Sequence, residues 1–358
     1  MTLHQMNPAR PNAVGDIPRG NPMPEPQTAA PALMVEGLRA YYQTRWFGVT
    51  REVRAVDDIN LRIEHDEIYG IAGESSSGKS SLIKTIAGAI RPPLNVVSGS
   101  VNFDFGSRKV DLYALSPAKR TAIRWKHLAY IMQGSMSVLN PLRRVRQSFV
   151  DFAFRHMGLP MPAFLRAVED HLLRLHLQPA VLDAYPHELS GGMRQRVVIA
   201  LATVCRPGFI IADEPTTALD VVVQKSVLTM IREVQREMRA SILFVTHDMA
   251  VHANLTDRLG IMYAGRLVEE GRTRDIFRNP RHPYTVHLIR SLPRIGDAEP
   301  RKGLEGTPPN LADPPPGCRF HTRCPIAMDV CRHVVPPMQA LGGGHRVACH
   351  AVTEGVVQ

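Results

Sequence analysis

The sequence predicts an α/β protein whose core is a mostly parallel sheet. From residue 33 onward, short apolar runs such as 59–63 and 68–72 alternate with Gly-containing turns and helical stretches. Two further apolar runs, 209–212 and 242–245, are too short for helices, and acidic or His residues follow them. Because open α/β sheets bind ligands at the carboxyl ends of their strands, we expect the chemistry of the protein there.

Length and composition are those of a globular protein of two or three domains. The 358 residues, 44% hydrophobic and 21% charged, exclude a fibrous or wholly disordered chain. The 43 Lys and Arg exceed the 33 Asp and Glu, and the net charge of +10 suits nucleotides, anionic lipids or nucleic acid. No run approaches the roughly 18–20 apolar residues of a membrane span, and the N-terminus lacks the apolar centre of a signal peptide, so we expect a cytoplasmic protein.

Three segments differ from this core. Residues 1–32 hold seven prolines and few large apolar side chains, which predicts a disordered tail. Residues 136–200 contain no strand-like run, and the apolar positions of 165–177 repeat at helical spacing, which predicts a helical insert. Beyond Asn279 the chain is rich in Pro, Gly, Cys and Arg, so we expect a linker and then a small appended module.

A phosphate-binding loop follows the apolar run at 68–72. Residues 73–80 read GESSSGKS, which matches GxxxxGK[ST], and a helical run follows at 81–89. In such a loop the backbone N–H groups face an anion, Lys79 neutralises the β- and γ-phosphate oxygens, and the Ser80 hydroxyl can bind Mg²⁺. The predicted nucleotide-binding residues of this segment are Gly73, Ser75, Ser76, Ser77, Gly78, Lys79, Ser80 and Ser81.

An acidic strand end completes this expectation. The run at 209–212 leads into Asp213 and Glu214. We expect Asp213 near Mg²⁺, and Glu214 could polarise the attacking water as a general base. A solvated acid at a strand end is the alternative interpretation of Glu214.

Residues 189–196, LSGGMRQR, resemble the signature motif of the ATP-binding-cassette (ABC) ATPases. The resemblance implies that Ser190, Gly191 and Gly192 form a second anion site, which closes over the ATP of a partner cassette in a head-to-tail pair. It also implies a RecA-like P-loop NTPase core with an antiparallel β subdomain, a helical signature subdomain and a C-terminal Cys-rich extension. The corresponding bounds are 33–280 for the nucleotide-binding domain, about 136–200 for its helical subdomain and 281–358 for the extension.

Other residues fall in the order of this family. Gln133 matches the glutamine that senses Mg²⁺ and the attacking water, and His247 matches the histidine that contacts the γ-phosphate. Asp220 matches a loop that touches the opposite cassette, although a helix cap is its alternative role. Tyr42 matches the aromatic residue that stacks on adenine, with core packing as the alternative. Ser76 departs from the usual Gly, so the loop is mildly strained if this position needs a positive φ.

Three short segments resemble the oligopeptide/dipeptide importer branch. They are residues 138–141 (VLNP), 185–188 (YPHE) and 279–285 (NPRHPYT). The resemblance implies the ATP-hydrolysing subunit of a peptide importer, with ATP and Mg²⁺ as cofactors and a peripheral position on the cytoplasmic face of the inner membrane. The implied partners are a second cassette, identical or homologous, two integral membrane permease subunits and, indirectly, an extracytoplasmic solute-binding protein. No nucleic acid is expected.

Four of the five cysteines lie close together in the C-terminal sequence. Cys318, Cys324, Cys331 and Cys349 could together hold a 4Fe-4S cluster or Zn²⁺. Tight CxxC pairs, which structural zinc sites favour, are absent, and Cys324-Pro325 is similar to the Cys-Pro ending of a ferredoxin-type run. We therefore expect a 4Fe-4S cluster, with zinc or another metal and unligated cysteines as the alternatives.

A competing hypothesis is a nucleic-acid-associated ABC ATPase with a zinc-binding module. The net charge of +10 and the four cysteines favour it. The basic residues are scattered along the chain, however, and this hypothesis leaves the importer-like segments unexplained.

Overall fold

The computed structural model describes residues 30–134, 137–217, 219–292 and 304–356. The predicted N-terminal tail, residues 1–32, lies almost wholly outside the described residues. Residues 31–358 form one compact unit, to which everything below refers.

The first sheet is antiparallel and forms early in the chain. Its order is β2-β1-β4-β5, and its strands span the following residues: β1 Leu33–Trp46, β2 Val49–Ile63, β4 Leu94–Asp104 and β5 Lys109–Asp111. Leu33 pairs with Ile63 on one side and with Phe103 on the other. All three side chains are buried, which fixes the register of the sheet.

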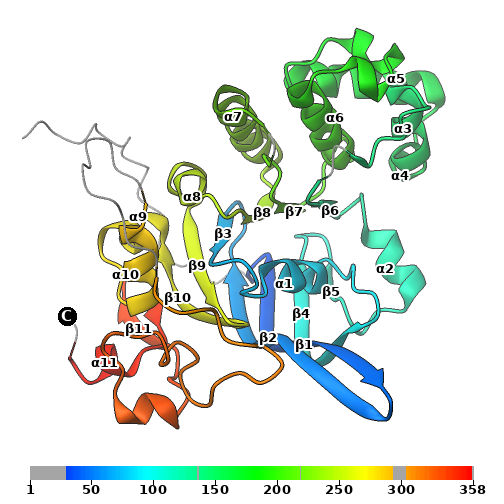
Figure 1. Ribbon diagram of the computed structural model, residues 1–358. Coiled ribbons are helices and arrows are strands. Elements are labelled where there is room, and N and C mark those ends of the chain that lie inside the picture. Colours follow the sequence, from blue (N-terminus) through cyan, green and yellow to red (C-terminus); the bar gives the residue numbers. More distant parts are fainter. Residues whose placement is uncertain (1–29, 135–136, 218, 293–303, 357–358) are drawn as a thin grey trace, which may run out of the picture. The chain divides into compact units, whose positions relative to one another are not determined.

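The second sheet has eight strands in the order β11-β12-β10-β9-β3-β8-β7-β6 (Figure 1). Five of them run parallel: β6 Leu128–Ile131, β7 Phe209–Asp213, β8 Ser241–Val245, β3 Ile68–Ala72 and β9 Arg258–Tyr263. Every residue of β3, β7 and β8 is buried, as the apolar runs predicted. Helix α1 (Lys79–Ile86) joins the two sheets, because Leu82, Ile83 and Ile86 share one apolar cluster with strands of both.

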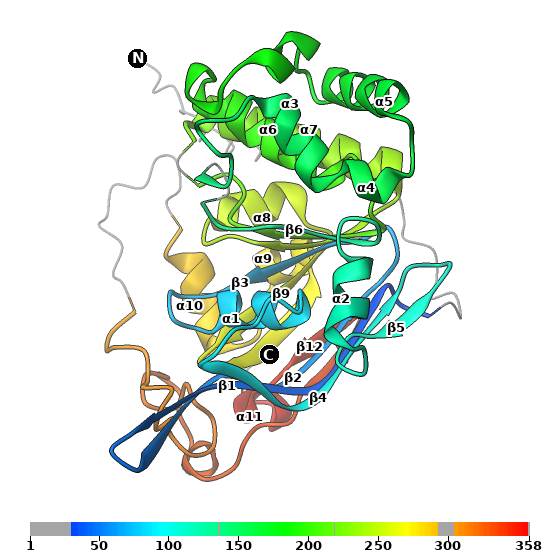
Figure 2. The same ribbon diagram turned by 90° about the vertical axis from the view of Figure 1, so that its right-hand side faces the viewer.

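The described residues between β6 and β7 form helices, turns and bends, with no strand among them. They include α3 Val145–Phe152, α4 Phe154–Met157, α5 Met161–Arg174, two short 3-10 turns at Pro179–Asp183 and Pro186–Glu188, and α6 Gly191–Thr203. These helices gather in one group (green in Figures 1 and 2). Their apolar faces form a common cluster with α7 (Val221–Met238), which places the start of α6 beside the start of α7.

The remaining helices and strands lie between these elements or in the C-terminal region. They are α2 Pro117–Ile123, α8 Met249–Leu255, β10 Arg266–Arg272, α9 Thr273–Arg278, α10 Pro283–Arg290, a 3-10 turn at Asp329–Arg332, β11 Gln339–Gly342, β12 His345–Val347 and α11 His350–Thr353. Strand β12 pairs with β10, with Glu269 opposite Val347. The C-terminal region therefore extends the main sheet, whereas composition alone suggested an appended module.

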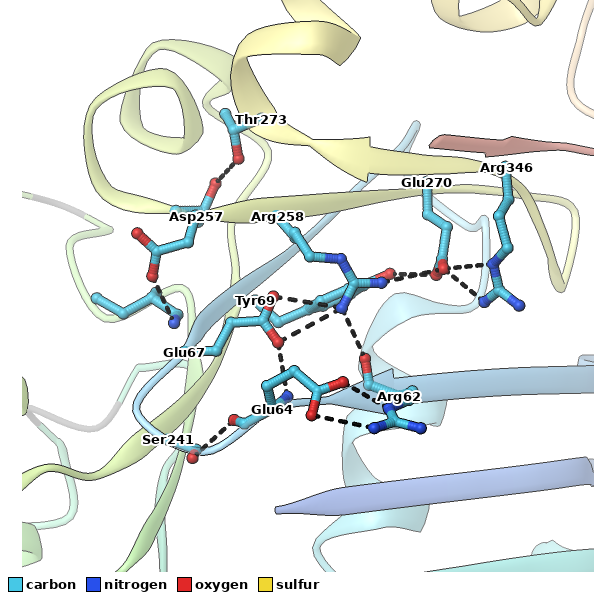
Figure 3. Close-up of polar contacts among 12 residues, drawn as sticks. Arg62, Glu64, Glu67, Tyr69, Ser241, Asp257, Arg258, Glu270, Thr273 and Arg346 are labelled. Atoms are coloured by element: carbon cyan, nitrogen blue, oxygen red, sulfur yellow. Dashed lines mark hydrogen bonds and ion pairs between the residues drawn. The ribbon is translucent and has the colours of Figure 1, made fainter. Parts of the chain in front are cut away.

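A buried ion network stands at the amino end of β3, opposite the end that carries the phosphate loop (Figure 3). Arg258 contacts Glu67 at 3.3 Å and Glu270 at 3.1 Å, and Tyr69 donates a hydrogen bond to Glu270 at 2.8 Å. Arg346 of β12 pairs with the same Glu270. The network thus ties β3, β9, β10 and β12 together around the buried side chains of Glu67, Tyr69 and Glu270.

None of the helices within the described ranges combines the length and the apolar character that crossing a bilayer requires.

Candidate functional site

The phosphate loop connects β3 to α1 and depends on two glycines. Gly78 has a φ of +101°, and a Cβ there would stand 2.0 Å from the carbonyl oxygen of Ala55. Gly73 has a φ of +151°, and a Cβ there would stand 2.1 Å from the carbonyl oxygen of Met262. Any side chain at either position would force the loop away from the sheet. Ser76 has a φ of +64°, so this serine adopts a conformation that favours glycine, as its departure from the family pattern suggested.

Lys79 folds back across this loop. Its ammonium donates hydrogen bonds to the carbonyl oxygens of Gly73 at 2.7 Å and Glu74 at 2.8 Å. Burial lowers the pKa of Lys79, and the nearby carboxylates of Glu214, Asp213 and Glu74 oppose that effect. The amine is therefore held beside the backbone amides of the loop, where an anion would meet both.

The carboxyl end of β7 supplies a buried carboxylate. Asp213 is 2% exposed, and its Oδ2 accepts a hydrogen bond from the Tyr130 hydroxyl at 3.3 Å. Its Oδ1 is buried and has no partner among the described residues. Burial raises the pKa of Asp213, which means that the surrounding groups do not fully offset the cost of burying its negative charge. An unpaired carboxylate oxygen next to a phosphate loop fits a hard, oxygen-binding cation such as Mg²⁺.

The predicted catalytic residues contact one another through the carboxylate of Glu214. Gln133 donates a hydrogen bond from Nε2 to Glu214 Oε2 at 3.1 Å, and His247 Nδ1 lies 3.3 Å from Oε1. Thr217, which the sequence reasoning missed, donates to Oε2 at 2.9 Å. The loops after β6, β7 and β8 carry these residues, so adjacent parallel strands bring them together. Both oxygens of the Glu214 carboxylate have polar partners, and its side chain is 16% exposed. Such a carboxylate can orient a water molecule and accept its proton.

The signature residues lie at the start of α6. Ser190 caps the helix, since its Oγ accepts a hydrogen bond from Met193 N–H at 3.3 Å. A Cβ on Gly192 would stand 2.6 Å from Val223 Cγ1, whereas a Cβ on Gly191 would meet nothing nearer than Leu219 Cδ2 at 4.0 Å. Gly192 therefore permits the close approach of α6 and α7, whereas Gly191 has room for a side chain and is partly exposed.

Two further predicted residues make local contacts. Asp220 caps α7 by accepting from Val222 N–H at 3.0 Å and Val223 N–H at 2.9 Å. The hydroxyl of Tyr42 lies 3.1 Å from Ser81 Oγ, and the ring packs against the apolar cluster that α1 shares with the sheets. Tyr42 thus stands at the start of α1, while its stacking on adenine stays a prediction.

The prediction of a 4Fe-4S cluster or zinc site is wrong. Among the residues that the structure describes, no group of three or more His, Cys, Asp or Glu could hold a metal ion. The four residues concerned are free cysteines: Cys318, Cys324, Cys331 and Cys349. Burial raises the pKa of Cys318 to about 12 and of Cys324 to about 11. Both side chains are partly buried and pack against the apolar cluster around Phe320.

Two family comparisons match different parts of the chain. Residues 56–217 match the family described as ABC transporter, and residues 268–331 match the one described as oligopeptide/dipeptide transporter, C-terminal region. The chain is 39% identical over 326 residues to the dipeptide transport ATP-binding protein DppD of Caldanaerobacter subterraneus, covering 90% of this chain and 98% of that protein. It is 38% identical over 335 residues to the oligopeptide transport ATP-binding protein OppD of Salmonella typhimurium, covering 92% of this chain and 96% of that protein.

Solved structures show the same fold. The ATP-binding cassette MJ0796, dimeric and bound to ADP and Pi, superposes with a TM-score of 0.57 at 24% identity, covering 68% of this chain and 99% of that one. CbiO1 from Clostridium perfringens, part of the ABC transporter complex cbiONQ, superposes with a TM-score of 0.58 at 26% identity, covering 70% and 92% of the two chains. The alternative of a nucleic-acid-associated ATPase with a zinc module has no support, because these relatives are dipeptide and oligopeptide transport ATP-binding proteins and the described residues offer no metal site.

Proposed function

Because the chain belongs to the family of ATP-binding proteins of oligopeptide and dipeptide ABC transporters, we propose that it binds and hydrolyses ATP to drive peptide import. The observation that carries this proposal is the convergence of Gln133, Thr217 and His247 on the carboxylate of Glu214. This cluster stands at the strand ends that also carry the phosphate loop and Asp213. The residues for phosphate binding, metal binding and general-base catalysis therefore lie at one edge of the sheet.

Each residue of the site has a role in this proposal. The amides of residues 73–81 and the ammonium of Lys79 bind the β- and γ-phosphates, and Tyr42 stacks on the adenine. Glu214 orients the attacking water and accepts its proton, while Gln133 and His247 hold the carboxylate and reach toward the γ-phosphate. Ser80 and Asp213, with Gln133, would hold Mg²⁺, which neutralises phosphate charge when bound.

The signature residues act on a second nucleotide in this proposal. Ser190 and the amides of Gly191 and Gly192 stand at the N-terminus of α6, a helix of 13 residues with the dipole and free donors that suit an anion. Ser190 is exposed and Gly191 partly exposed, so this end is accessible to the ATP of a partner cassette, identical or homologous. Asp220, at the start of α7, would touch the same partner.

The proposed assembly contains two cassettes, two integral membrane permease subunits and, outside the membrane, a solute-binding protein. The chain would lie peripherally on the cytoplasmic face of the inner membrane. The test is uptake of a radiolabelled tripeptide by cells that carry wild type, Lys79→Ala or no copy of the gene. We expect uptake only with wild type, because removing the ammonium weakens ATP binding. Equal uptake by all three strains would refute the proposed function.

A further inference from the structure

The C-terminal region contacts the phosphate loop through Glu74. The Arg323 guanidinium forms two hydrogen bonds to the Glu74 carboxylate, Nη1 to Oε2 at 2.8 Å and Nη2 to Oε1 at 3.1 Å. The Tyr284 hydroxyl accepts a hydrogen bond from Glu74 N–H at 2.7 Å. The Lys79 ammonium donates a hydrogen bond to the third polar group, the Glu74 carbonyl oxygen, at 2.8 Å. Glu74 is thereby held by its carboxylate, its N–H and its carbonyl at once.

The contact is built from buried, well-packed groups. The Arg323 side chain is 4% exposed and Glu74 is 26% exposed. The guanidinium lies 5.9 Å from the centre of the Tyr263 ring and donates to its hydroxyl at 3.3 Å. The Tyr263 and Tyr284 rings stand 4.6 Å apart. A bidentate guanidinium–carboxylate pair on such an aromatic platform has a fixed geometry, unlike a surface ion pair.

Electrostatics gives this contact a consequence for nucleotide binding. Glu74 is the second residue of the phosphate loop, so its negative charge stands next to the site proposed for the β- and γ-phosphates. Uncompensated, that charge would repel the nucleotide and draw Lys79 toward itself. Arg323 neutralises it with a group that burial and two hydrogen bonds keep in place.

We infer that Arg323 is a positioning residue of the nucleotide site: it neutralises and orients Glu74, so that the C-terminal region sets the affinity of the phosphate loop for ATP. The inference rests on the proposed function, because it assumes that the loop binds ATP. It assigns the C-terminal region a part in nucleotide binding, beyond its contribution of two strands to the sheet.

The test is equilibrium binding of a fluorescent N-methylanthraniloyl ATP analogue, with Mg²⁺, to the full-length chain. We expect Arg323→Gln to raise Kd about tenfold, a factor that matches the lower end for a charged hydrogen bond. Adding Glu74→Gln removes the repelling charge, so Glu74→Gln/Arg323→Gln should return to within about threefold of wild type. The penalty of Arg323→Gln should also shrink as salt screens the charge, and Arg323→Lys should recover part of the affinity.

Arg346→Gln is the matched control. Arg346 is another arginine of the C-terminal region that pairs with a cassette carboxylate, Glu270, but at the amino end of β3, opposite the end that carries the phosphate loop. Its exchange should leave Kd at the wild-type value. Circular dichroism identifies any variant that fails to fold, and Arg323→Lys and the double variant then carry the test.

Two results would overturn the inference. One is an Arg323→Gln variant that binds as tightly as wild type. The other is a double variant as weak as Arg323→Gln, because a purely structural role would not be rescued by removing the opposing charge. If instead wild type binds no better than Lys79→Ala, the proposed function itself fails and the inference falls with it. The Lys79→Ala comparison therefore separates the two failures.

Discussion

Glu67→Gln should make the protein more stable at alkaline pH. Glu67 is 5% exposed, its Oε2 accepts a hydrogen bond from Glu64 N–H at 2.7 Å, and Arg258 lies 3.3 Å away (Figure 3). Burial is the largest influence and raises the pKa of Glu67 from 4.5 to about 7, although Arg258 opposes it. Folded Glu67 therefore carries a proton over a pH range in which the unfolded chain has lost it.

The sign and size of the effect follow from linkage. Between pH 4.5 and about 7 the folded state binds more protons than the unfolded state, so stability falls as pH rises through this window. Well above pH 7, the free energy of unfolding of wild type is therefore about 3 kcal/mol lower than it is below pH 4.5. Glutamine stays neutral and keeps an oxygen acceptor for Glu64 N–H. The stability of Glu67→Gln relative to wild type should therefore grow by about 3 kcal/mol from about pH 5 to about pH 8.5.

Urea unfolding of both proteins over this pH range measures the difference. Burial lowers the pKa of His171, His252 and His282 to about 4. Their contribution to the pH dependence of stability is shared by both proteins and cancels in the comparison. A flat profile for Glu67→Gln would show that Glu67 is ionised when folded and would refute the burial argument.

Two further variants test the site. Glu214→Gln should keep the affinity for MgATP while slowing phosphate release by roughly 10²-fold or more in the assembled transporter, the scale for losing a general base; unchanged turnover would remove Glu214 from that role. Gly192→Ala should lower the free energy of unfolding by about 1–3 kcal/mol, because its Cβ would stand 2.6 Å from the stiff Val223 side chain. Gly191→Ala, which meets only Leu219 at 4.0 Å, is the control and should unfold with nearly wild-type stability; equal losses would contradict the packing role of Gly192.

Local patterns predicted the parts of the fold that local interactions determine. The apolar runs at 68–72 and 209–212 coincide with β3 and β7 to within one residue, because buried parallel strands need continuous apolar sequence. The helical spacing at 165–177 corresponds to α5. The polar residues after β6, β7 and β8 do meet, since parallel strands place their carboxyl ends at one edge.

Contacts between residues that are far apart in the chain could not be predicted from local sequence patterns. Arg323 and Glu74 are 249 positions apart, and neither has a neighbour in sequence that predicts the other. The pairing of β12 with β10 was missed for the same reason, because a three-residue strand carries almost no periodicity. Cysteine spacing misled the prediction of a cluster, because the spacing of cysteines along the chain does not determine how their side chains are arranged in the fold.

The strand order also dictates when the phosphate loop can become rigid during synthesis. Strand β3, which leads into the loop, is hydrogen-bonded to β8 and β9 and to neither of the strands before it. At roughly 5–20 residues per second, translation reaches β8 some ten to thirty seconds after β3 has left the ribosome. During that interval the antiparallel sheet can form from neighbouring hairpin strands, while Ile68–Ala72 remains an apolar segment without partners. Among the described strands, β3 is therefore the one that waits longest for a hydrogen-bonded partner.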